Sequence, residues 1–327
     1  MKTTTFLRRV LLAAAVAALV GCATQPSAPP EKTPPPVVAV TPAASAPDTT
    51  NALPTVPTPP VAVVPKAPPR PPRIGLALGG GAARGFAHIG VLQVLEEQGI
   101  RPDLVVGTSA GSLVAAMYAS GTSPVELASL AEGMEEYSIS DWTFPSRGLL
   151  RGEALAKYVR EHTNGRSIEK MRVPLGIVAT DLANGQPILF QRGDPGTAVR
   201  ASSAVPAVFQ PVMISGREYV DGGLVSPVPV RFARQMGAEI VIAVDISASP
   251  EGNSTADAMH MLLQTFAIMG KSIQQFELRD ADLVLRPHLK GVSSSDFSAR
   301  KKALQAGREV ATAAIPELRA LIAAKTR

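Results

Sequence analysis

One serine in this sequence has the surroundings expected of a nucleophile. The segment Gly107–Gly111 reads Gly-Thr-Ser-Ala-Gly, with Ser109 at its centre, between the apolar run Leu104–Val106 and the helical pattern Ser112–Met117. A strand, a sharp turn and a helix in this order are the context of a nucleophile elbow. Small residues at the two ends, Gly107 and Gly111, would allow the tight turn. The helix N-terminus would favour negative charge developing beside Ser109. The competing interpretation is a glycine-rich helix cap in which Ser109 only caps.

A second glycine-rich segment, Leu78–Gly85, lies at another predicted strand end, before a helix that begins near Phe86. Its backbone N–H groups are unobstructed, and a tetrahedral intermediate needs such donors, each typically worth about 3 kcal/mol of barrier. The residues we expect to form this oxyanion hole are Gly79, Gly80, Gly81, Ala82 and Arg84. The same physics would suit a phosphate or dinucleotide loop. However, Arg84 replaces the final glycine of that fingerprint, so we predict no nucleotide cofactor.

A serine nucleophile needs a base, and Asp221 is the best candidate. It ends a short extended run and is followed by Gly222 and Gly223, which would let the backbone turn away and leave the carboxylate facing an open site. Taken alone, it could equally be an ordinary Asp-Gly turn. His288, after the last predicted strand, is the reserve candidate. Core or surface roles are expected for the other histidines, His88, His162 and His260.

The elements that would position these residues alternate between strands and helices from Ile74 onward. Such alternation implies a largely parallel sheet covered by helices. The predicted strands are 74–78, 104–106, 175–180, 188–190, 212–214, 240–244 and 283–285. The predicted helices are 86–98, 110–120, 153–162, 229–236, 257–277 and 299–322, the last with a kink or break at Pro316.

The N-terminus has the layout of a secretory signal, with three basic residues before the uncharged apolar run Val10–Val20. Leu19–Cys22 resembles the lipobox of bacterial lipoproteins, in which the cysteine receives a lipid and becomes residue one of the mature chain. A plain signal peptide with an incidental cysteine is the alternative. From this resemblance we expect residues 1–21 to be removed, Cys22 to be the lipid attachment site, and the protein to be anchored in the outer membrane, facing the periplasm. The outer membrane is expected because Ala23 follows the cysteine, whereas an Asp at this position would resemble a signal for retention in the inner membrane.

Residues 22–73 are dominated by Pro, Ala, Val and Thr and read as an extended tether, before one domain over residues 74–327. Without its signal the chain would hold 29 Lys+Arg, because three of the 32 precede Cys22, against 27 Asp+Glu. No basic run remains that would suggest nucleic acid as a partner. Cys22 is the only cysteine, which excludes a disulfide within the chain. No metal-ligand pattern appears, so neither metal nor cofactor is expected.

Four blocks in this order resemble the patatin-like phospholipase family, particularly its bacterial members and the catalytic domain of neuropathy target esterase. The blocks are the glycine loop with its helix to Leu92, Gly107–Gly111, Arg200–Pro206 and Asp221–Gly223. The resemblance covers about residues 74–285 and implies a three-layer α/β sandwich with a mainly parallel central sheet flanked by helices. The chain pattern adds C-terminal helices from about residue 298 to this domain.

The resemblance also implies a chemistry: hydrolysis of phospholipid or other acyl-ester lipids by a Ser109–Asp221 dyad without histidine, with the glycine-loop amides holding the oxyanion. Ala82 departs from the family pattern, which has a further glycine there, and its methyl group restricts φ. Two other functions remain open at this point. One is a histidine-dependent serine esterase using His288, and the other is a catalytically silent envelope scaffold.

Overall fold

The computed structural model describes residues 69–134, 141, 147–251 and 255–327. The predicted signal peptide, Cys22 and nearly all of the predicted tether lie outside the described residues. The described residues all belong to one compact unit, Pro65–Arg327.

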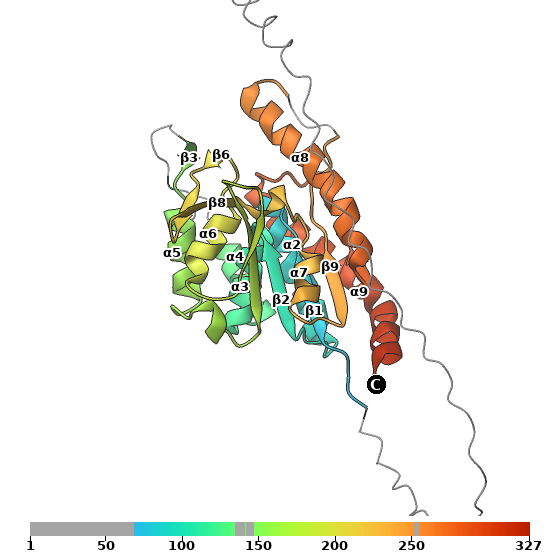
Figure 1. The fold of residues 1–327 in the computed structure, drawn as a ribbon. Coiled ribbons are helices and arrows are strands. Elements are labelled where there is room, and N and C mark those ends of the chain that lie inside the picture. Colours follow the sequence, from blue (N-terminus) through green and yellow to red (C-terminus); the bar gives the residue numbers. More distant parts are fainter. Residues whose placement is uncertain (1–68, 135–140, 142–146, 252–254) are drawn as a thin grey trace, which may run out of the picture. The chain divides into compact units, whose positions relative to one another are not determined.

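Within the described residues, the largest sheet has a parallel centre and an antiparallel extension (Figure 1). Its parallel strands are, in order across the sheet, β10 (Leu283–Leu285), β9 (Ile240–Val244), β1 (Ile74–Leu78), β2 (Leu104–Thr108) and β4 (Leu175–Asp181). The antiparallel strands on and beyond β4 are β8 (Arg217–Asp221), β7 (Val212–Ile214) and β5 (Pro187–Phe190). A separate parallel pair is formed by β3 (Gly148–Leu150) and β6 (Ala207–Phe209).

Both faces of the parallel strands are buried, as their β-branched and aliphatic sequences require. In β1, Leu76 and Leu78 pack into one hydrophobic cluster and Ala77 into another. The same alternation continues in β9, where Ile242 joins the first cluster and Val241 the second. Because successive strand residues point to opposite faces, the sheet separates two helical layers. This three-layer α/β arrangement confirms the predicted fold class.

Most helices cover the face of the larger cluster, whereas α7 and the turn after α8 cover the other. The helices of the larger layer are α2 (Phe86–Glu97), α3 (Ala110–Ser120), α4 (Pro124–Gly133), α5 (Glu153–His162), α6 (Pro195–Ser202) and α9 (Arg300–Lys325). The remaining helices of the described residues are α7 (Val230–Gln235) and α8 (Ala258–Glu277). The 3₁₀ turns are η1 (Ala82–Gly85), η3 (Ile168–Lys170), η4 (Gly222–Leu224), η5 (Leu278–Asp280) and η6 (Phe297–Ala299).

The C-terminal helix differs from expectation because α9 runs unbroken through Pro316. Pro316 is exposed, and so is Thr312, whose carbonyl loses its helical partner and can bond to water instead. Close packing on α2 also holds α9 in place. A Cβ added at Gly90 would lie 2.0 Å from the Leu304 carbonyl oxygen, and one at Gly307 would lie 2.0 Å from that of Ala87. The two helices therefore touch backbone to backbone.

Candidate active site

Ser109 stands at the corner between β2 and α3 in a strained backbone conformation. Its φ is 52° and its ψ is −125°. Positive φ is uncommon for a residue with a side chain and costs on the order of 1–3 kcal/mol, so it persists only where the surroundings enforce it. The Ser109 N–H donates to Ser202 Oγ over 2.9 Å. The Ser109 carbonyl accepts from the Ser112 hydroxyl over 2.6 Å. These bonds fix the corner on both sides of the serine.

The glycines of this corner serve close packing. A Cβ at Gly111 would lie 2.1 Å from the Leu78 carbonyl oxygen, and one at Gly107 would lie 2.4 Å from that of Gly111. Neither glycine has positive φ. The corner after β2 is therefore pressed against the end of β1, which brings the nucleophile candidate next to the glycine loop.

Asp221 reaches the same point from the antiparallel part of the sheet. Thr108 at the end of β2 pairs with Val178 of β4, and Asp221 at the end of β8 pairs with the next β4 residue, Ala179. A Cβ added to Gly222 would lie 3.1 Å from Thr108 Cγ2. The ends of β2 and β8 thus meet over β4, which explains how residues far apart in sequence become neighbours.

The Asp221 carboxylate is buried, with 6% of the residue exposed. Oδ1 accepts the Gly223 N–H over 2.6 Å. Burial raises the pKa of Asp221 to about 6, while hydrogen bonds from Gly223 and from the Ser109 hydroxyl act in the lowering direction. Among the described residues, Oδ2 has no partner at ordinary hydrogen-bond geometry. The Ser109 hydroxyl is therefore near the carboxylate but not in a fully formed bond, which is usual for catalytic pairs without substrate.

The glycine loop lies against Ser109, and only part of it has free amides. A Cβ at Gly80 would lie 3.1 Å from Ser109 Cβ. However, the Gly79 and Gly80 N–H groups donate to the Val244 and Pro227 carbonyls, each over 3.0 Å. These two amides support the loop and are not available to an oxyanion in this arrangement.

Near Ser109, the amides of Gly81 and Ala82 in the loop and of Ala110 and Gly111 at the start of α3 donate to no described residue. The Arg84 N–H is used within the loop, on the Gly81 carbonyl at 3.2 Å. Of the predicted donors, Gly81 and Ala82 therefore keep unbonded amides, and Ala110, the residue after the serine, has one too, at the position that donates in nucleophile elbows.

Ala82 and Arg84 are the two residues of the predicted oxyanion hole that are not glycine. Ala82 has a φ of 49°, so its backbone adopts a conformation that favours glycine although the residue carries a methyl group. Arg84 turns into the protein, where burial lowers the pKa of its guanidinium and Asp245 acts in the opposite direction. Its buried Nε has no hydrogen-bond partner within the described residues. The Arg84 side chain is thus partly buried.

The four histidines have surroundings other than Ser109. His88 is fully buried and its Nε2 lies 2.8 Å from the Gly79 carbonyl oxygen. Burial lowers the pKa of His88 to about 4, so the neutral ring donates to that carbonyl and supports the loop. His288 is exposed beyond β10, which β9 and β1 separate from β2. Three strand spacings place those strand ends about 14 Å apart. His162 bonds to the Tyr158 carbonyl and His260 pairs with Asp257.

Three further residues support the site and were not expected from the sequence. Ser202 accepts the Ser109 N–H and donates to the Val178 carbonyl over 2.6 Å. The Ser226 carbonyl accepts the Thr108 hydroxyl over 2.9 Å, and the Ser226 hydroxyl donates to the buried carboxyl of Glu277. Ser202 lies in the Arg200–Pro206 block, which carried the family resemblance but did not indicate what Ser202 does. No local pattern singled out Glu277.

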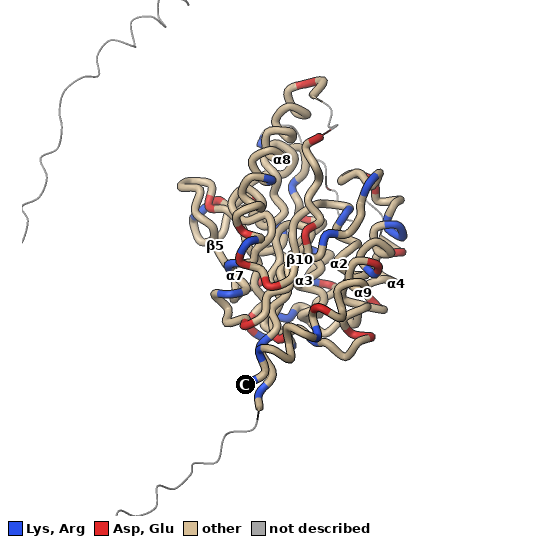
Figure 2. The backbone as a smooth tube through the Cα atoms, turned by 90° about the vertical axis from the view of Figure 1, so that its right-hand side faces the viewer, with Lys and Arg blue, Asp and Glu red and all other residues tan. Residues whose placement is uncertain are grey.

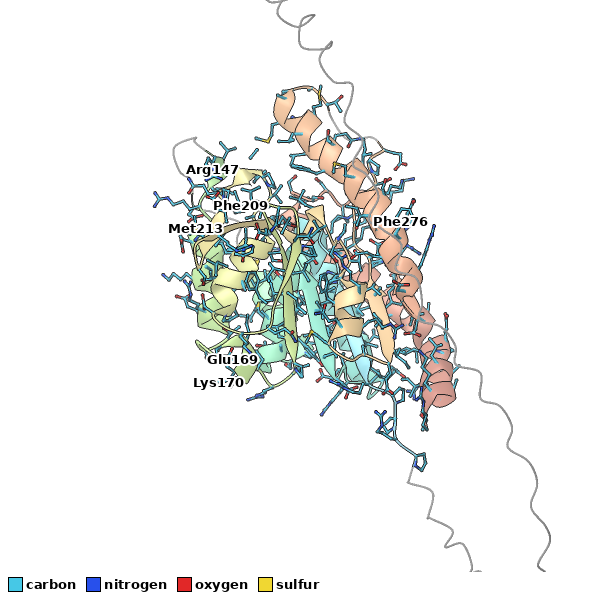
Figure 3. The ribbon with its side chains drawn as sticks, in the orientation of Figure 1. Arg147, Glu169, Lys170, Phe209, Met213 and Phe276 are labelled. Carbon is cyan, nitrogen blue, oxygen red and sulfur yellow. The ribbon has the colours of Figure 1, made fainter. Side chains whose placement is uncertain are left out.

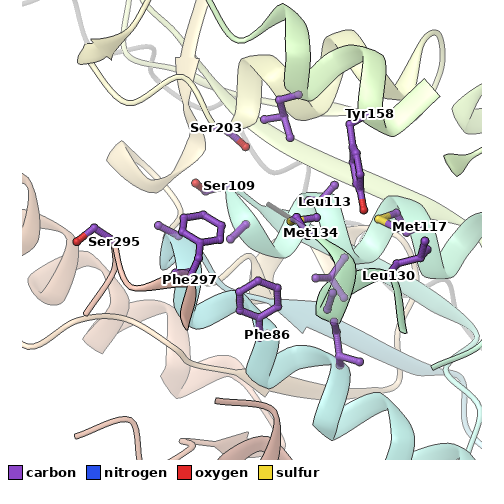
Figure 4. A pocket seen from close by; sticks show the side chains of 18 of the residues that line it. Phe86, Ser109, Leu113, Met117, Leu130, Met134, Tyr158, Ser203, Ser295 and Phe297 are labelled. Atoms are coloured by element: carbon purple, nitrogen blue, oxygen red, sulfur yellow. The ribbon is translucent and has the colours of Figure 1, made fainter. Parts of the chain in front are cut away.

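An uncharged cavity of about 300 Å³ opens from Ser109 (Figure 4). Ser109 and Ser203 face each other across it, Ser295 and Phe297 lie to one side of Ser109, and on the other side the cavity continues past Leu113 towards Met117 and Leu130. None of its described lining residues carries a charge. Such a lining suits an alkyl chain. Within the described residues, no group of three or more His, Cys, Asp or Glu side chains is arranged to hold a metal ion.

Fold and site define an α/β protein with a strained serine at a strand–helix corner, a buried aspartate beside it and an apolar cavity before it. Residues 76–234 match the family model Patatin-like phospholipase. The comparisons thus support a patatin-like phospholipase domain over these residues.

Similar proteins include an uncharacterized NTE family protein of Mycobacterium tuberculosis, 36% identical over 203 residues that cover 59% of this chain and 56% of that protein. Patatin-like phospholipase domain-containing protein 6 of Homo sapiens is 34% identical over 186 residues, covering 54% of this chain and 14% of that protein. The chain thus spans about half the length of its mycobacterial relative. The structure of VipD from Legionella pneumophila, at 15% identity, matches with a TM-score of 0.54 over 76% of this chain and 68% of VipD, and shows likeness of fold alone.

Proposed function

We propose that this protein hydrolyses acyl esters of lipids, with Ser109 as the nucleophile and Asp221 as its base. The observation that carries the proposal is the meeting of the strained Ser109, which lines an uncharged cavity, with the buried Asp221 carboxyl. The family match and the relatives support lipid as the substrate class.

In the proposed reaction the Ser109 oxygen attacks the ester carbonyl while Asp221 takes the hydroxyl proton. The negative oxygen of the tetrahedral intermediate accepts hydrogen bonds from the free amides of Gly81, Ala82 and Ala110. Asp221 then gives its proton to the leaving alcohol, and an acyl-serine remains. Asp221 next takes a proton from water, whose oxygen attacks the acyl carbonyl. When this second tetrahedral intermediate collapses, Asp221 returns the proton to the Ser109 oxygen and the fatty acid is released.

The surroundings of Asp221 suit this role. A pKa of about 6 leaves the carboxylate ionised at neutral pH and more basic than an exposed aspartate. The substrate acyl chain would occupy the cavity between α3 and α4, whose side chains Leu113, Met117 and Leu130 offer only apolar contacts. The polar part of the lipid would remain on the Ser203 side of Ser109.

The test is hydrolysis of phosphatidylethanolamine and its lysophospholipid by the purified protein, with mass spectrometry of the released fatty acid. We expect release by the parent chain and none above background with Ser109→Ala. A fluorophosphonate probe should label the parent and not this variant. An unlabelled parent would favour the silent scaffold. Loss of activity with His288→Ala but not with Asp221→Ala would instead favour the histidine-dependent esterase.

We also propose that Cys22 is lipidated and holds the domain at the outer membrane, facing the periplasm. The sequence pattern at Leu19–Cys22 and the proline-rich stretch after it support this proposal. Cells fed radiolabelled palmitate should incorporate it into the parent chain and not into Cys22→Ala. Incorporation that survives this substitution would refute the anchor.

A further inference from the structure

Helix α8 exposes apolar side chains to a degree that no other described element matches. Of the nine large hydrophobic residues exposed in the described part of the chain, six belong to α8. They are Met261, Leu262, Leu263, Ile268, Met269 and Phe276. Only Gln274 and Glu277 of this helix are buried. Single exposed apolar residues are ordinary, but a group on one element marks an interaction surface.

Helical geometry gathers most of these side chains on one side. At 3.6 residues per turn, an arc about 120° wide holds five of them together with two small hydroxyl residues. This apolar face of α8 consists of Met261, Leu262, Thr265, Ile268, Met269, Ser272 and Phe276. No charged residue lies in the arc, and the charged positions of the helix, Lys271 and Glu277, lie outside it. Figure 2 accordingly shows α8 uncharged over most of its length.

The end of the apolar face carries a cation suited to a lipid headgroup. Arg279 is exposed, and its guanidinium lies 4.8 Å above the ring of Phe276. An arginine in this position can reach anionic headgroups while the aromatic ring lies among the upper acyl carbons. The face itself offers no carboxylate that would repel such a surface. Charge and apolar area are therefore complementary to an anionic lipid layer.

The position of α8 connects this face with the candidate active site. The helix follows β9 and rises beyond the carboxyl end of the parallel strands, the end at which Ser109 stands (Figures 1 and 2). Glu277, at its last turn, bonds to Ser226 and to the Val228 N–H, whose neighbour Pro227 accepts the Gly80 N–H. No described helix is both long and apolar enough to pass through a membrane. The pattern therefore suits a helix that lies in the surface of a bilayer.

We propose that α8 binds a lipid bilayer, with its apolar face at the boundary between headgroups and acyl chains and Arg279 among the headgroups. The choice of lipid as the occupant rests on the proposed function, because a hydrolase of membrane lipids gains from a surface that holds its site at the substrate. A second copy of this chain and a protein partner are the competing occupants.

The test uses the chain from residue 22 with Cys22→Ala, which carries no lipid and keeps the whole compact unit Pro65–Arg327. Binding to vesicles of phosphatidylethanolamine and phosphatidylglycerol is measured by flotation. We expect the double substitution Ile268→Glu, Met269→Glu to weaken binding by about ten-fold or more, because two apolar side chains no longer enter the bilayer. Its thermal unfolding midpoint should match that of the parent, since both side chains are about half exposed, at 51% each.

Met213→Glu is the matched control. Met213 is 61% exposed on β7, near the sheet edge opposite to β10, whereas Phe276 marks α8 on the other side (Figure 3). This variant should bind vesicles and hydrolyse a water-soluble ester as the parent does. Ser109→Ala should also bind normally, and if it still hydrolyses lipid the proposed function fails while the result for α8 stands.

Three outcomes would overturn the proposal. The first is equal vesicle binding by the parent and the α8 double variant. The second is a parent that is dimeric in analytical ultracentrifugation and becomes monomeric in the double variant without any change in vesicle binding, which would assign the face to a second copy. The third is an equal loss of binding in Met213→Glu, which would contradict a specific role for α8.

Discussion

The corners after β1 and β2 are built alike but use their backbone strain differently. Each turns a parallel strand into a helix, and each contains one residue with a side chain at positive φ, Ala82 in the first and Ser109 in the second. Nearby positions such as Gly111 require glycine because there is no space for a Cβ, and not because their φ is positive. Glycine in such a motif therefore signals close contact between the corners.

The two strained residues differ in what their strain achieves. At Ser109 it holds the hydroxyl beside Asp221 and at the mouth of the cavity. At Ala82 it only sets the direction of the loop, since a methyl group has no chemistry to present. A substitution that relieves the strain at Ser109 should therefore abolish activity, whereas one that relieves the strain at Ala82 should leave activity unchanged.

The largest expected effect is at Ser109. Ser109→Ala should reduce lipid hydrolysis by about 10⁴-fold or more, because no attacking oxygen remains. Ser109→Gly should be equally inactive yet raise the free energy of unfolding by about 1 kcal/mol, because glycine accepts the positive φ. Activity assays and urea unfolding measure the two effects. Destabilisation by Ser109→Gly relative to Ser109→Ala would contradict the strain assigned to this corner.

Asp221→Asn should reduce activity by about 10³-fold or more, since the amide cannot accept the serine proton. In the parent, kcat/KM should fall as pH decreases below about 6, where Asp221 becomes protonated. A pH–rate profile measures this, and a profile with no acid limb near that value would exclude Asp221 as the base.

Asp221 should also make the parent less stable as pH rises. Because its pKa in the folded protein is raised to about 6, the folded state binds more protons than the unfolded state between about pH 4 and 6. The free energy of unfolding should therefore decrease across this range, by up to about 3 kcal/mol from this group. Asp221→Asn should lose this contribution, as urea titrations across this range can show. An unchanged pH dependence in that variant would assign it to other groups.

The contact between the corners can be broken at Gly111. Gly111→Ala would place a Cβ 2.1 Å from the Leu78 carbonyl oxygen, so we expect a loss of several kcal/mol of stability and poor recovery of folded protein. Gly133→Ala is the control, because no atom lies within 4 Å of its added Cβ. Circular dichroism during thermal unfolding compares the two. Similar midpoints would mean that the corners can separate without cost.

Glu277 is the residue through which α8 supports the segment Ser226–Val228 beside the candidate site. Glu277→Ala leaves the Ser226 hydroxyl and the Val228 N–H without their buried acceptor, which should lower stability by about 2 kcal/mol. Because this segment holds Gly80 and Thr108, kcat should fall more than KM rises. Glu277→Gln, which keeps an acceptor oxygen, should restore most of kcat. Loss of stability with kcat unchanged would limit Glu277 to a structural role.

The smallest effect is expected at Ala82. Ala82→Gly should raise the free energy of unfolding by about 0.5–1 kcal/mol, because it removes the strain at a φ of 49°. Activity should remain within about two-fold, since the amide donor is kept. Ala83→Gly, at a position without positive φ, should instead lower stability. Urea unfolding measures the free energy of unfolding of both variants, and a loss of stability in Ala82→Gly would contradict the strain assigned to Ala82.

The fold was predictable because its signals are local. The aliphatic runs at β1, β2 and β9 and the helices after the first two appear in the sequence at nearly their observed bounds. The antiparallel placement of β8 was not predictable from the five-residue run Arg217–Asp221, because register depends on the strand it meets. The continuity of α9 through Pro316 was missed for a similar reason: packing against α2 is not visible in local propensity.

For the candidate site, the sequence determined which residues can do chemistry: Ser109 between small residues at a strand end, Asp221 before two glycines, and a glycine loop before a helix. Only the tertiary structure decided which of them meet. Thr108 and Asp221 become neighbours because β4 pairs with both their strands. The free amides are those left after Val244 and Pro227 have bonded to Gly79 and Gly80. Residue type sets what a group can do, but its burial, pKa and partners depend on chain segments that lie far away in sequence.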